Sequence, residues 1–337
     1  SSARIYVASA GGVLYAFKPD GSFDWGFDTV GTFQVGPAVV QATTVTTPVD
    51  EIVIPDSVGG GNSLIWRATS ASAIGVASDE RDFLAAPLIL NGKVYYASQN
   101  RNSGPTITHV SMQTIGADGV LGATITNAAA GATVVNPAVA FYGLVTDGTS
   151  VYAATAPASG AGALFAFNGS LSQTWTKALT AGLAGEPTFG IDGKLYASEL
   201  SNSGVNSATF DPTNGNRTGF VSIGGATGIG MVPLQGSDGH IYFPRRSGQG
   251  LFAYKGNQLS WTLKTPGNTL RYATMDCQGR LFSAAGSTVF AFVSDDTGLA
   301  DTAWPNLRRD SRNTGNASTG WTKYGMRTAA GPAGCIQ

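Results

Sequence analysis

Few residues of this chain belong to the types that carry acid–base, nucleophilic or metal chemistry. Its 337 residues include only two histidines, His109 and His240, and two cysteines, Cys277 and Cys335. Neither histidine has Cys, His or clustered carboxylates at ligand spacing. His240 follows the turn dipeptide Asp238-Gly239, and His109 alternates with apolar residues. Both therefore fit hydrogen-bonded strand or turn residues better than a metal site.

A pair of arginines, Arg245 and Arg246, directly follows the strand-like residues IYFP. Guanidinium groups at a strand end can pair with a carboxylate or an anionic sugar. With His240, these arginines are our candidates for a ligand-binding face. The alternative, a solvated loop with no ligand, stays open.

Two polar segments resemble cation loops only superficially. Asp211–Asn216 (DPTNGN) has oxygen-rich side chains but lacks the spaced Asp ladder and terminal Glu of a calcium loop. Asp295-Asp296 lies in a similar segment. We interpret both as turns. The chain also has no GxSxG nucleophile elbow and no phosphate- or dinucleotide-binding fingerprint in a strand-to-helix setting.

The two cysteines are the minimum for one disulfide. A bond between Cys277 and Cys335 would fix a Gly/Ala/Pro-rich tail and close a loop of roughly sixty residues, worth about 2–4 kcal/mol in an oxidising compartment. The alternative is two unrelated thiols.

Composition indicates a large, weakly charged β protein. Hydrophobic residues make up 42% of the chain, charged residues 12%, and there are 46 glycines. Low charge with many small turn residues is typical of short strands joined by tight turns. The formal net charge of −1 gives no electrostatic basis for binding nucleic acid or an anionic membrane. No apolar run is long enough for a transmembrane segment.

An internal repeat organises the whole chain. A strand preceded by a turn and followed by small residues recurs near positions 4, 51, 93, 150, 194, 240 and 280, as in IYVAS, VYYAS and LYASE. Seven copies at a period in the forties are typical of four-stranded propeller blades. We therefore predict one all-β domain over residues 1–337, a seven-bladed β-propeller of four-stranded antiparallel blades.

Each copy supplies its other strands in a fixed order. An apolar strand ending in Asn-Gly or Asp-Gly precedes the recurring strand, and these dipeptides favour type I′ hairpins. A third strand, such as VLYAF or ALFAF, follows, and a fourth often carries tryptophan, as at Trp25, Trp175 and Trp261. Their recurrence at one repeat position favours packing between blades. Stacking on a sugar is the alternative.

The two ends of the repeat differ. The first copy begins at its second strand, whereas the seventh, Leu270 to about Trp304, is expected to be complete. We predict that residues 305–337 form a closing segment and tail, and that Trp321–Thr328 supplies the missing strand of the first blade. Such pairing would close the ring and remove two exposed sheet edges.

These copies resemble the PQQ-type propeller repeat, whose consensus is roughly VYVGS-DG-LYALD-TG-W. Residues 5–25, 151–175 and 241–261 carry the match best, and Trp304–Gly315 (WPNLRRDSRNTG) is similar to a segment found beside such propellers in envelope and secreted proteins. The quinone-dependent dehydrogenases of this class have eight blades, a vicinal cysteine pair and a calcium site. None of these features is present, so we expect no cofactor. The propeller lipoprotein of the outer-membrane assembly machine is nearer in character, although it has eight blades and a lipid-bearing cysteine.

Three functions remain open. The first is a non-enzymatic, secreted, periplasmic or cell-surface scaffold that binds a protein or glycan partner. The second is a hydrolase or lyase acting on a polysaccharide or lactone in the central channel, which would need converging acidic, His or Arg side chains. The third is an assembly subunit of a surface layer or filament, which predicts an apolar subunit interface.

Overall fold

A computed structural model gives the positions of most of the chain. It describes residues 4–18, 20–28, 38–42, 49–58, 62–69, 72–79, 81–83, 85–100, 107–115, 122, 125–127, 140–156, 161–183, 185–201, 204–223, 232–245, 250–264, 272–276, 278–285, 288–306 and 317. In these ranges all regular elements are strands. Its described part contains no helix that is long and apolar enough to cross a membrane. The prediction of an all-β protein is confirmed.

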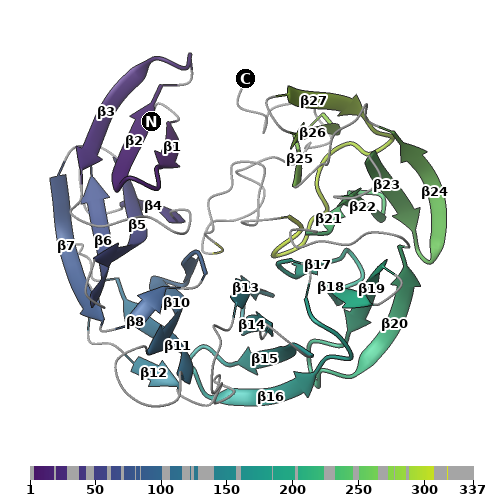
Figure 1. Cartoon of the computed structure of the whole chain (residues 1–337), viewed down its shortest axis with the longest axis horizontal. Helices are drawn as coiled ribbons and strands as arrows, with labels where there is room; N and C mark the ends of the chain where they lie inside the picture. Colours follow the sequence, from purple (N-terminus) through teal and green to yellow (C-terminus); the bar gives the residue numbers. More distant parts are fainter. Residues whose placement is uncertain are drawn as a thin grey trace. The chain divides into compact units, whose positions relative to one another are not determined.

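Contacts between backbone segments divide the chain into two compact units, one up to Leu144 and the other from Val145 to Asn313. The first unit holds three antiparallel sheets (Figure 1). Their strands are β1 Ile5–Ala8, β2 Val13–Phe17 and β3 Phe23–Asp28; β4 Ala38–Ala42, β5 Val49–Val58, β6 Asn62–Thr69 and β7 Ser72–Asp79; and β8 Arg81–Phe83, β9 Leu88–Leu90, β10 Lys93–Asn100, β11 Ile107–Thr114 and β12 Ile125–Asn127.

Four more sheets follow, beginning with one whose first strand spans the division between the units. Their strands are β13 Ala140–Thr146, β14 Val151–Ala156, β15 Ala163–Phe167 and β16 Gln173–Ala178; β17 Thr188–Phe189, β18 Leu195–Ser201, β19 Gly204–Phe210 and β20 Arg217–Ser222; β21 Leu234–Gln235, β22 His240–Arg245, β23 Gly250–Lys255 and β24 Gln258–Leu263; and β25 Ala273–Met275, β26 Arg280–Ala285 and β27 Thr288–Val293. We number the seven sheets in chain order.

The recurring strands of the sequence repeat are the second-position strands of these sheets. They are β5, β10, β14, β18, β22 and β26, while β1 is the corresponding strand of the first sheet. In four sheets, four consecutive strands pair antiparallel in chain order. The repeat therefore predicts the strand order of these four sheets correctly. The third sheet departs from it, with five strands in which both β8 and β9 pair with β10.

The hairpin turns only partly follow the prediction of type I′ geometry. Asn91 and Gly92 both have positive φ, 51° and 69°, as that turn requires. In the Asp147-Gly148, Asp192-Gly193 and Asp238-Gly239 turns, only the glycine has positive φ. The aspartate instead caps the turn, as Asp147 does by accepting hydrogen bonds from the N–H groups of Thr149 and Ser150. For these turns the type I′ prediction is wrong.

A row of three residues recurs across three sheets. Tyrosine on the second strand pairs with alanine on the third, and that alanine pairs with tryptophan on the fourth. The rows are Tyr6–Ala16–Trp25, Tyr152–Ala166–Trp175 and Tyr242–Ala253–Trp261. The aromatic ring centroids lie 6.0, 5.8 and 5.7 Å apart. Because the central alanine is small and buried, the two rings meet above it.

Apolar side chains on facing sheets form the core. Leu14 of the first sheet packs with Ile52 and Ile54 of the second. In the second unit, Tyr242 and Leu251 of the sixth sheet pack with Leu281 of the seventh. Consecutive sheets thus bury one another's faces, which is the packing of neighbouring propeller blades.

The seventh sheet is shorter than expected. Among the described residues it contains three strands, with β27 at its edge and no fourth strand, so the prediction that the seventh copy is complete is wrong. After β27 the chain turns at Ser294–Gly298 and returns to the first strands of three sheets (Figure 1). The proposed closing strand, Trp321–Thr328, lies outside the described residues.

The returning segment, Leu299–Asn306, forms backbone hydrogen bonds with the free edges of β17 and β21. Phe189 N–H donates to the Trp304 carbonyl at 2.7 Å, and Gln235 N–H donates to the Pro305 carbonyl at 2.8 Å. Trp304 is fully buried, and its indole N–H donates to Glu186 Oε1 at 2.8 Å. This segment satisfies backbone groups that two short edge strands would otherwise expose.

Candidate functional site

The residues singled out in the sequence are only partly described. His240 begins β22 and Arg245 ends it, while Arg246, Cys277 and Cys335 lie outside the described residues. The structure therefore does not test the proposed ligand face or the disulfide.

His240 does belong to a group of ionisable side chains. His240 Nδ1 lies 2.7 Å from Asp238 Oδ1 and 3.6 Å from Asp296 Oδ2. Asp296 comes from the turn that follows β27, 58 residues beyond Asp238. Within the described ranges, these are the residues of metal-ligating type that lie together, with all ligand atoms within 4.8 Å of one another.

The same group joins the sixth sheet to the seventh. The backbone N–H of Asp238 donates to Asp296 Oδ1 at 2.7 Å, and the Tyr242 hydroxyl donates to Asp296 Oδ2. The N–H of Ser237 donates to the Gly298 carbonyl at 3.0 Å. Several hydrogen bonds thus hold the turn before β22 against the turn after β27.

The two carboxyl groups have opposite pKa shifts. Burial, reinforced by the neighbouring Asp238 carboxylate, raises the pKa of Asp296 to about 6. Burial also acts to raise the pKa of Asp238, but hydrogen bonds from Asp296 and His240 outweigh it and lower that pKa. A proton shared between the two groups therefore resides on Asp296.

Two observations favour a structural role for this group over metal binding. First, both oxygens of Asp296 already accept hydrogen bonds, which an ion would have to displace. Second, the preceding sheets have a similar contact, in which the Trp175 indole N–H donates to the Pro212 carbonyl at 2.8 Å and the Tyr152 hydroxyl lies 3.3 Å from the same oxygen. Pro212 occupies the same turn position as Asp296. The group is a variant of a repeated contact between sheets.

Sequence reasoning missed Asp296 as a partner of His240. Asp238 and Asp296 are 58 residues apart in the sequence, so no ligand-spacing motif connects Asp296 to His240. The residues around Asp296 indicated only a turn. A usable signal was the match between Asp295-Asp296-Thr297 and Asp211-Pro212-Thr213, since both follow the third strand of their sheets. Asp211–Asn216 is itself a turn, with Thr213 N–H donating to Asp211 Oδ1 at 2.8 Å, as predicted.

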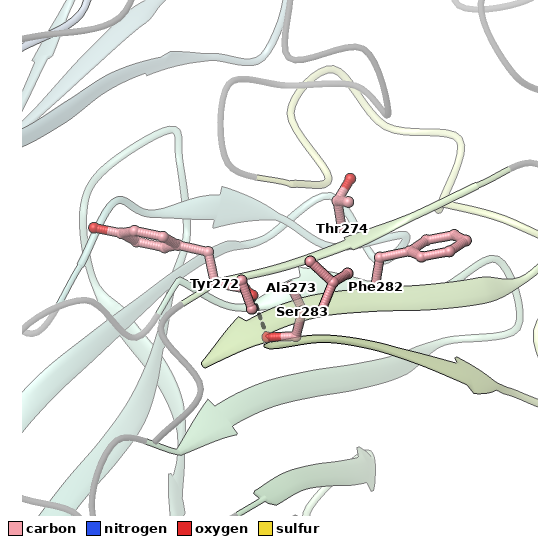
Figure 2. Close-up of a pocket in the computed structure, with 7 residues that line it drawn as sticks. Tyr272, Ala273, Thr274, Phe282 and Ser283 are labelled. Atoms are coloured by element: carbon pink, nitrogen blue, oxygen red, sulfur yellow. Dashed lines mark hydrogen bonds between the residues drawn. The ribbon is translucent and has the colours of Figure 1, made fainter. Parts of the chain in front are cut away.

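A second candidate site lies on the seventh sheet. A cavity of about 310 Å³ is lined mainly by apolar atoms, and Figure 2 shows Tyr272 and Phe282 extending from its two sides. Its lining residues are Tyr272, Ala273, Thr274, Phe282, Ser283, Ala284 and Val289. The Ser283 hydroxyl donates a hydrogen bond to the Tyr272 carbonyl. The cavity can accept an apolar side chain but presents no acid–base pair.

The neighbouring edge strand is unusually exposed. Val289 and Val293 of β27 have 71% and 87% of their surface exposed, while Phe290 and Phe292 stack in parallel at 6.0 Å and pack on the core. Among the described strands, β27 pairs only with β26. An uncharged, apolar edge of this kind is a template for pairing with another strand.

Solved structures identify the fold class. The chain is similar to the Dos1 propeller, with a TM-score of 0.64 and 10% identity over 88% of this chain and 78% of that one. It is also similar to BamB from Moraxella catarrhalis, with a TM-score of 0.51 and 19% identity over 86% of this chain and 97% of BamB. Together with the sheet pattern, these similarities show a β-propeller fold.

A third similar structure is puromycin hydrolase, with a TM-score of 0.54 and 13% identity over 88% of this chain and 51% of the hydrolase. No protein-family model matches the chain, and no curated protein matches it. At these identities the similarities concern the fold alone. A propeller fold does not by itself specify a function.

Proposed function

We propose that this propeller is a non-catalytic scaffold that binds an extended segment of another polypeptide chain along the edge of β27. The observation that carries the proposal is the apolar edge itself, where Val289 and Val293 remain 71% and 87% exposed on a strand paired on one side only among the described strands. A partner strand added there would gain main-chain hydrogen bonds and side-chain contacts.

The other sheets indicate what such a segment looks like. In three of them the place beside the third strand is taken by a strand whose tryptophan pairs with a buried alanine. Ala291 holds the corresponding position in β27, because it pairs with Phe282 where the others have tyrosine. A segment of this fourth-strand type would therefore place an aromatic residue opposite Ala291.

A peptide of the chain's own fourth-strand type tests this directly. The probe is a fluorescent peptide with the sequence of residues 171–180, LSQTWTKALT, and the control is a scrambled peptide of the same composition. We expect saturable binding of the first peptide, measured by anisotropy, and weaker binding to Ala291→Glu. Equal binding of both peptides, or no binding at concentrations where the chain is monomeric, would overturn the proposal.

The enzymatic alternative receives less support from the described residues. A hydrolase or lyase needs polar groups that converge on space open to a substrate. The Asp238, His240 and Asp296 side chains converge on one another and on Tyr242 instead. Similarly, Trp175 donates its indole N–H to a neighbouring sheet, which favours packing over glycan stacking.

We also propose that the seven sheets are blades of one ring of PQQ-like repeats, closed by the C-terminal tail. Tyr324–Thr328 (YGMRT) matches Tyr142–Thr146 (YGLVT) in β13, which is the first strand of its sheet. The first sheet lacks a strand at that place among the described residues. Residues 324–328 would therefore pair with β1.

Localisation and the disulfide belong to the same proposal. The PQQ-like resemblance supports a secreted, periplasmic or cell-surface protein, where a Cys277–Cys335 bond would persist. Non-reducing peptide mapping of protein purified without reductant tests the bond. Recovery of both cysteines as free thiols would contradict it.

A further inference from the structure

We infer that the partner strand at β27 is β27 of a second copy of this chain, so that the protein forms a two-fold symmetric dimer through this edge. The inference rests on the proposed function and names its partner. Its starting point is the sequence of the strand: residues 289–293 read Val-Phe-Ala-Phe-Val, the same in both directions.

This palindrome makes the edge complementary to itself in the antiparallel direction. Pairing centred on Ala291 places Ala291 opposite Ala291, Val289 opposite Val293, and Phe290 opposite Phe292. The exposed valines of both copies then lie on one face of the joint sheet, and the stacked phenylalanines lie on the other. A two-fold interface requires this self-complementarity.

Charge also permits this pairing. Strand β27, Thr288–Val293, has no charged residue, and the next residue, Ser294, would lie opposite Thr288. No like charges therefore face each other across the axis, which would otherwise destabilise a strand pair. Nor does the strand contain the lysine or proline with which proteins commonly protect an exposed edge.

The other candidate occupant within this chain is its own tail. Trp321-Thr322-Lys323 repeats Trp175-Thr176-Lys177 of the fourth-position strand β16. However, Lys323 adjoins Tyr324, which we place in the first sheet. Adjacent residues are about 3.8 Å apart and cannot serve the edges of two different sheets. We therefore favour the second copy, and the experiments below separate the two.

Sedimentation velocity of the full chain over a range of concentrations tests the dimer. We expect a reversible monomer–dimer equilibrium for the wild-type chain. Ala291→Glu would place two carboxylates directly opposite each other and weaken the dimer by about tenfold or more. Ala291→Ser adds a small polar group without charge, so it should still dimerise. Ala291 is exposed, and a thermal melt checks that each variant folds.

Disulfide trapping tests the register. Opposite residues of an antiparallel pair have Cα atoms about 4.5–5.5 Å apart, within reach of a disulfide. The variant Ala291→Cys should therefore give a covalent dimer linked through position 291 of both copies, which peptide mapping identifies. The matched control is Ala284→Cys, on the same face of β26. Its thiol would lie roughly 20 Å from its symmetry mate, because the two positions are three strand spacings apart and displaced by four residues along the strands, which is too far to link.

The outcomes distinguish the inference from the function on which it rests. A wild-type chain that stays monomeric at high concentration overturns the second-copy inference, as does linking of the Ala284→Cys variant as readily as the Ala291→Cys variant. If the monomer still binds the fourth-strand peptide, the scaffold proposal stands with a different partner. If it binds no peptide because the tail fills the edge, deleting residues 319–337 restores binding, and the inference is wrong.

Discussion

Tyr152 and Trp175 lie in one row of the fourth sheet, with ring centroids 5.8 Å apart, and both approach the carbonyl of Pro212 in the fifth sheet. The Trp175 indole N–H donates to this oxygen at 2.8 Å, whereas the Tyr152 hydroxyl lies 3.3 Å from it and donates to Asp147 Oδ2 at 2.7 Å. One acceptor thus joins an aromatic pair to the neighbouring sheet. For Trp175, packing between sheets accounts for the indole, because its N–H is satisfied within the protein.

Removing the indole N–H should weaken this contact. We expect Trp175→Phe to lower the free energy of unfolding by about 1–2 kcal/mol, since it loses a hydrogen bond and part of the ring contact. Tyr152→Phe should cost a similar amount, about 1–2 kcal/mol, because it loses the 2.7 Å hydrogen bond to Asp147 Oδ2 as well as the longer contact with Pro212. Urea denaturation of both variants and of the double variant measures the coupling. Additive effects would show that the shared acceptor is unimportant.

Local sequence patterns predicted the strands well, whereas contacts between segments far apart in the sequence could not be predicted from them. The recurring strands and the Trp25, Trp175 and Trp261 positions follow from alternation and turn residues, which act over a few residues. The Asp238–Asp296 pair depends on how two consecutive sheets pack face to face. Likewise, nothing in the sequence period showed that residues 299–306 would return to β17 and β21.

Trp304 provides a test of that returning segment. Trp304→Phe keeps most of the buried ring but loses the hydrogen bond to Glu186, so we expect a loss of about 1–3 kcal/mol in unfolding free energy. Glu186→Gln, which removes the buried charge, is the companion variant. If the phenylalanine variant is as stable as the wild type, the bond does not anchor the segment.

Two buried serines should be replaceable. Ser198 and Ser207 are paired residues of the fifth sheet, 0% and 1% exposed, and neither hydroxyl has a hydrogen-bond partner. Changing both to alanine removes polar groups whose burial is unfavourable, so stability should stay the same or rise by up to about 1 kcal/mol. Thr188→Ala is the control.

That control should behave in the opposite way, because Thr188 Oγ1 accepts a hydrogen bond from Gln235 Nε2 at 3.1 Å in a buried site. We expect it to lose about 1–2 kcal/mol. A marked loss in the double serine variant would instead reveal a buried water molecule bound to these hydroxyls.

The proposed closure makes a prediction for the tail. Gly143 in β13 has a φ of 151°, which favours glycine, and Gly325 is its counterpart in YGMRT. Gly325→Ala should therefore destabilise the protein, and deletion of residues 319–337 should do so more strongly, by several degrees in Tm. Unchanged melting of both variants would contradict pairing of the tail with β1.

The Asp238–Asp296 pair predicts a pH dependence of stability. Because burial raises the pKa of Asp296 to about 6, protonation of this group favours the folded state. Its stabilising contribution is complete below the ordinary aspartate pKa near 3.8 and is lost as the pH rises through 6. The lowered pKa of Asp238 acts oppositely, contributing above its ordinary value. Both contributions coexist between about pH 4 and 6.

Asp296→Asn should remove the loss of stability that the wild type shows as the pH rises through the pKa of Asp296. For the wild type, we expect the Asp296 contribution to unfolding free energy to fall by on the order of 3 kcal/mol between about pH 4 and 7. The asparagine variant cannot ionise, so its stability should be flatter over that range. Asp295→Asn, at the exposed neighbour, should retain the wild-type profile. Because His240 contacts both carboxyl groups, His240→Gln is measured alongside them. If the profile flattens in that variant but not in Asp296→Asn, the titrating group is the histidine and the assignment to Asp296 is wrong.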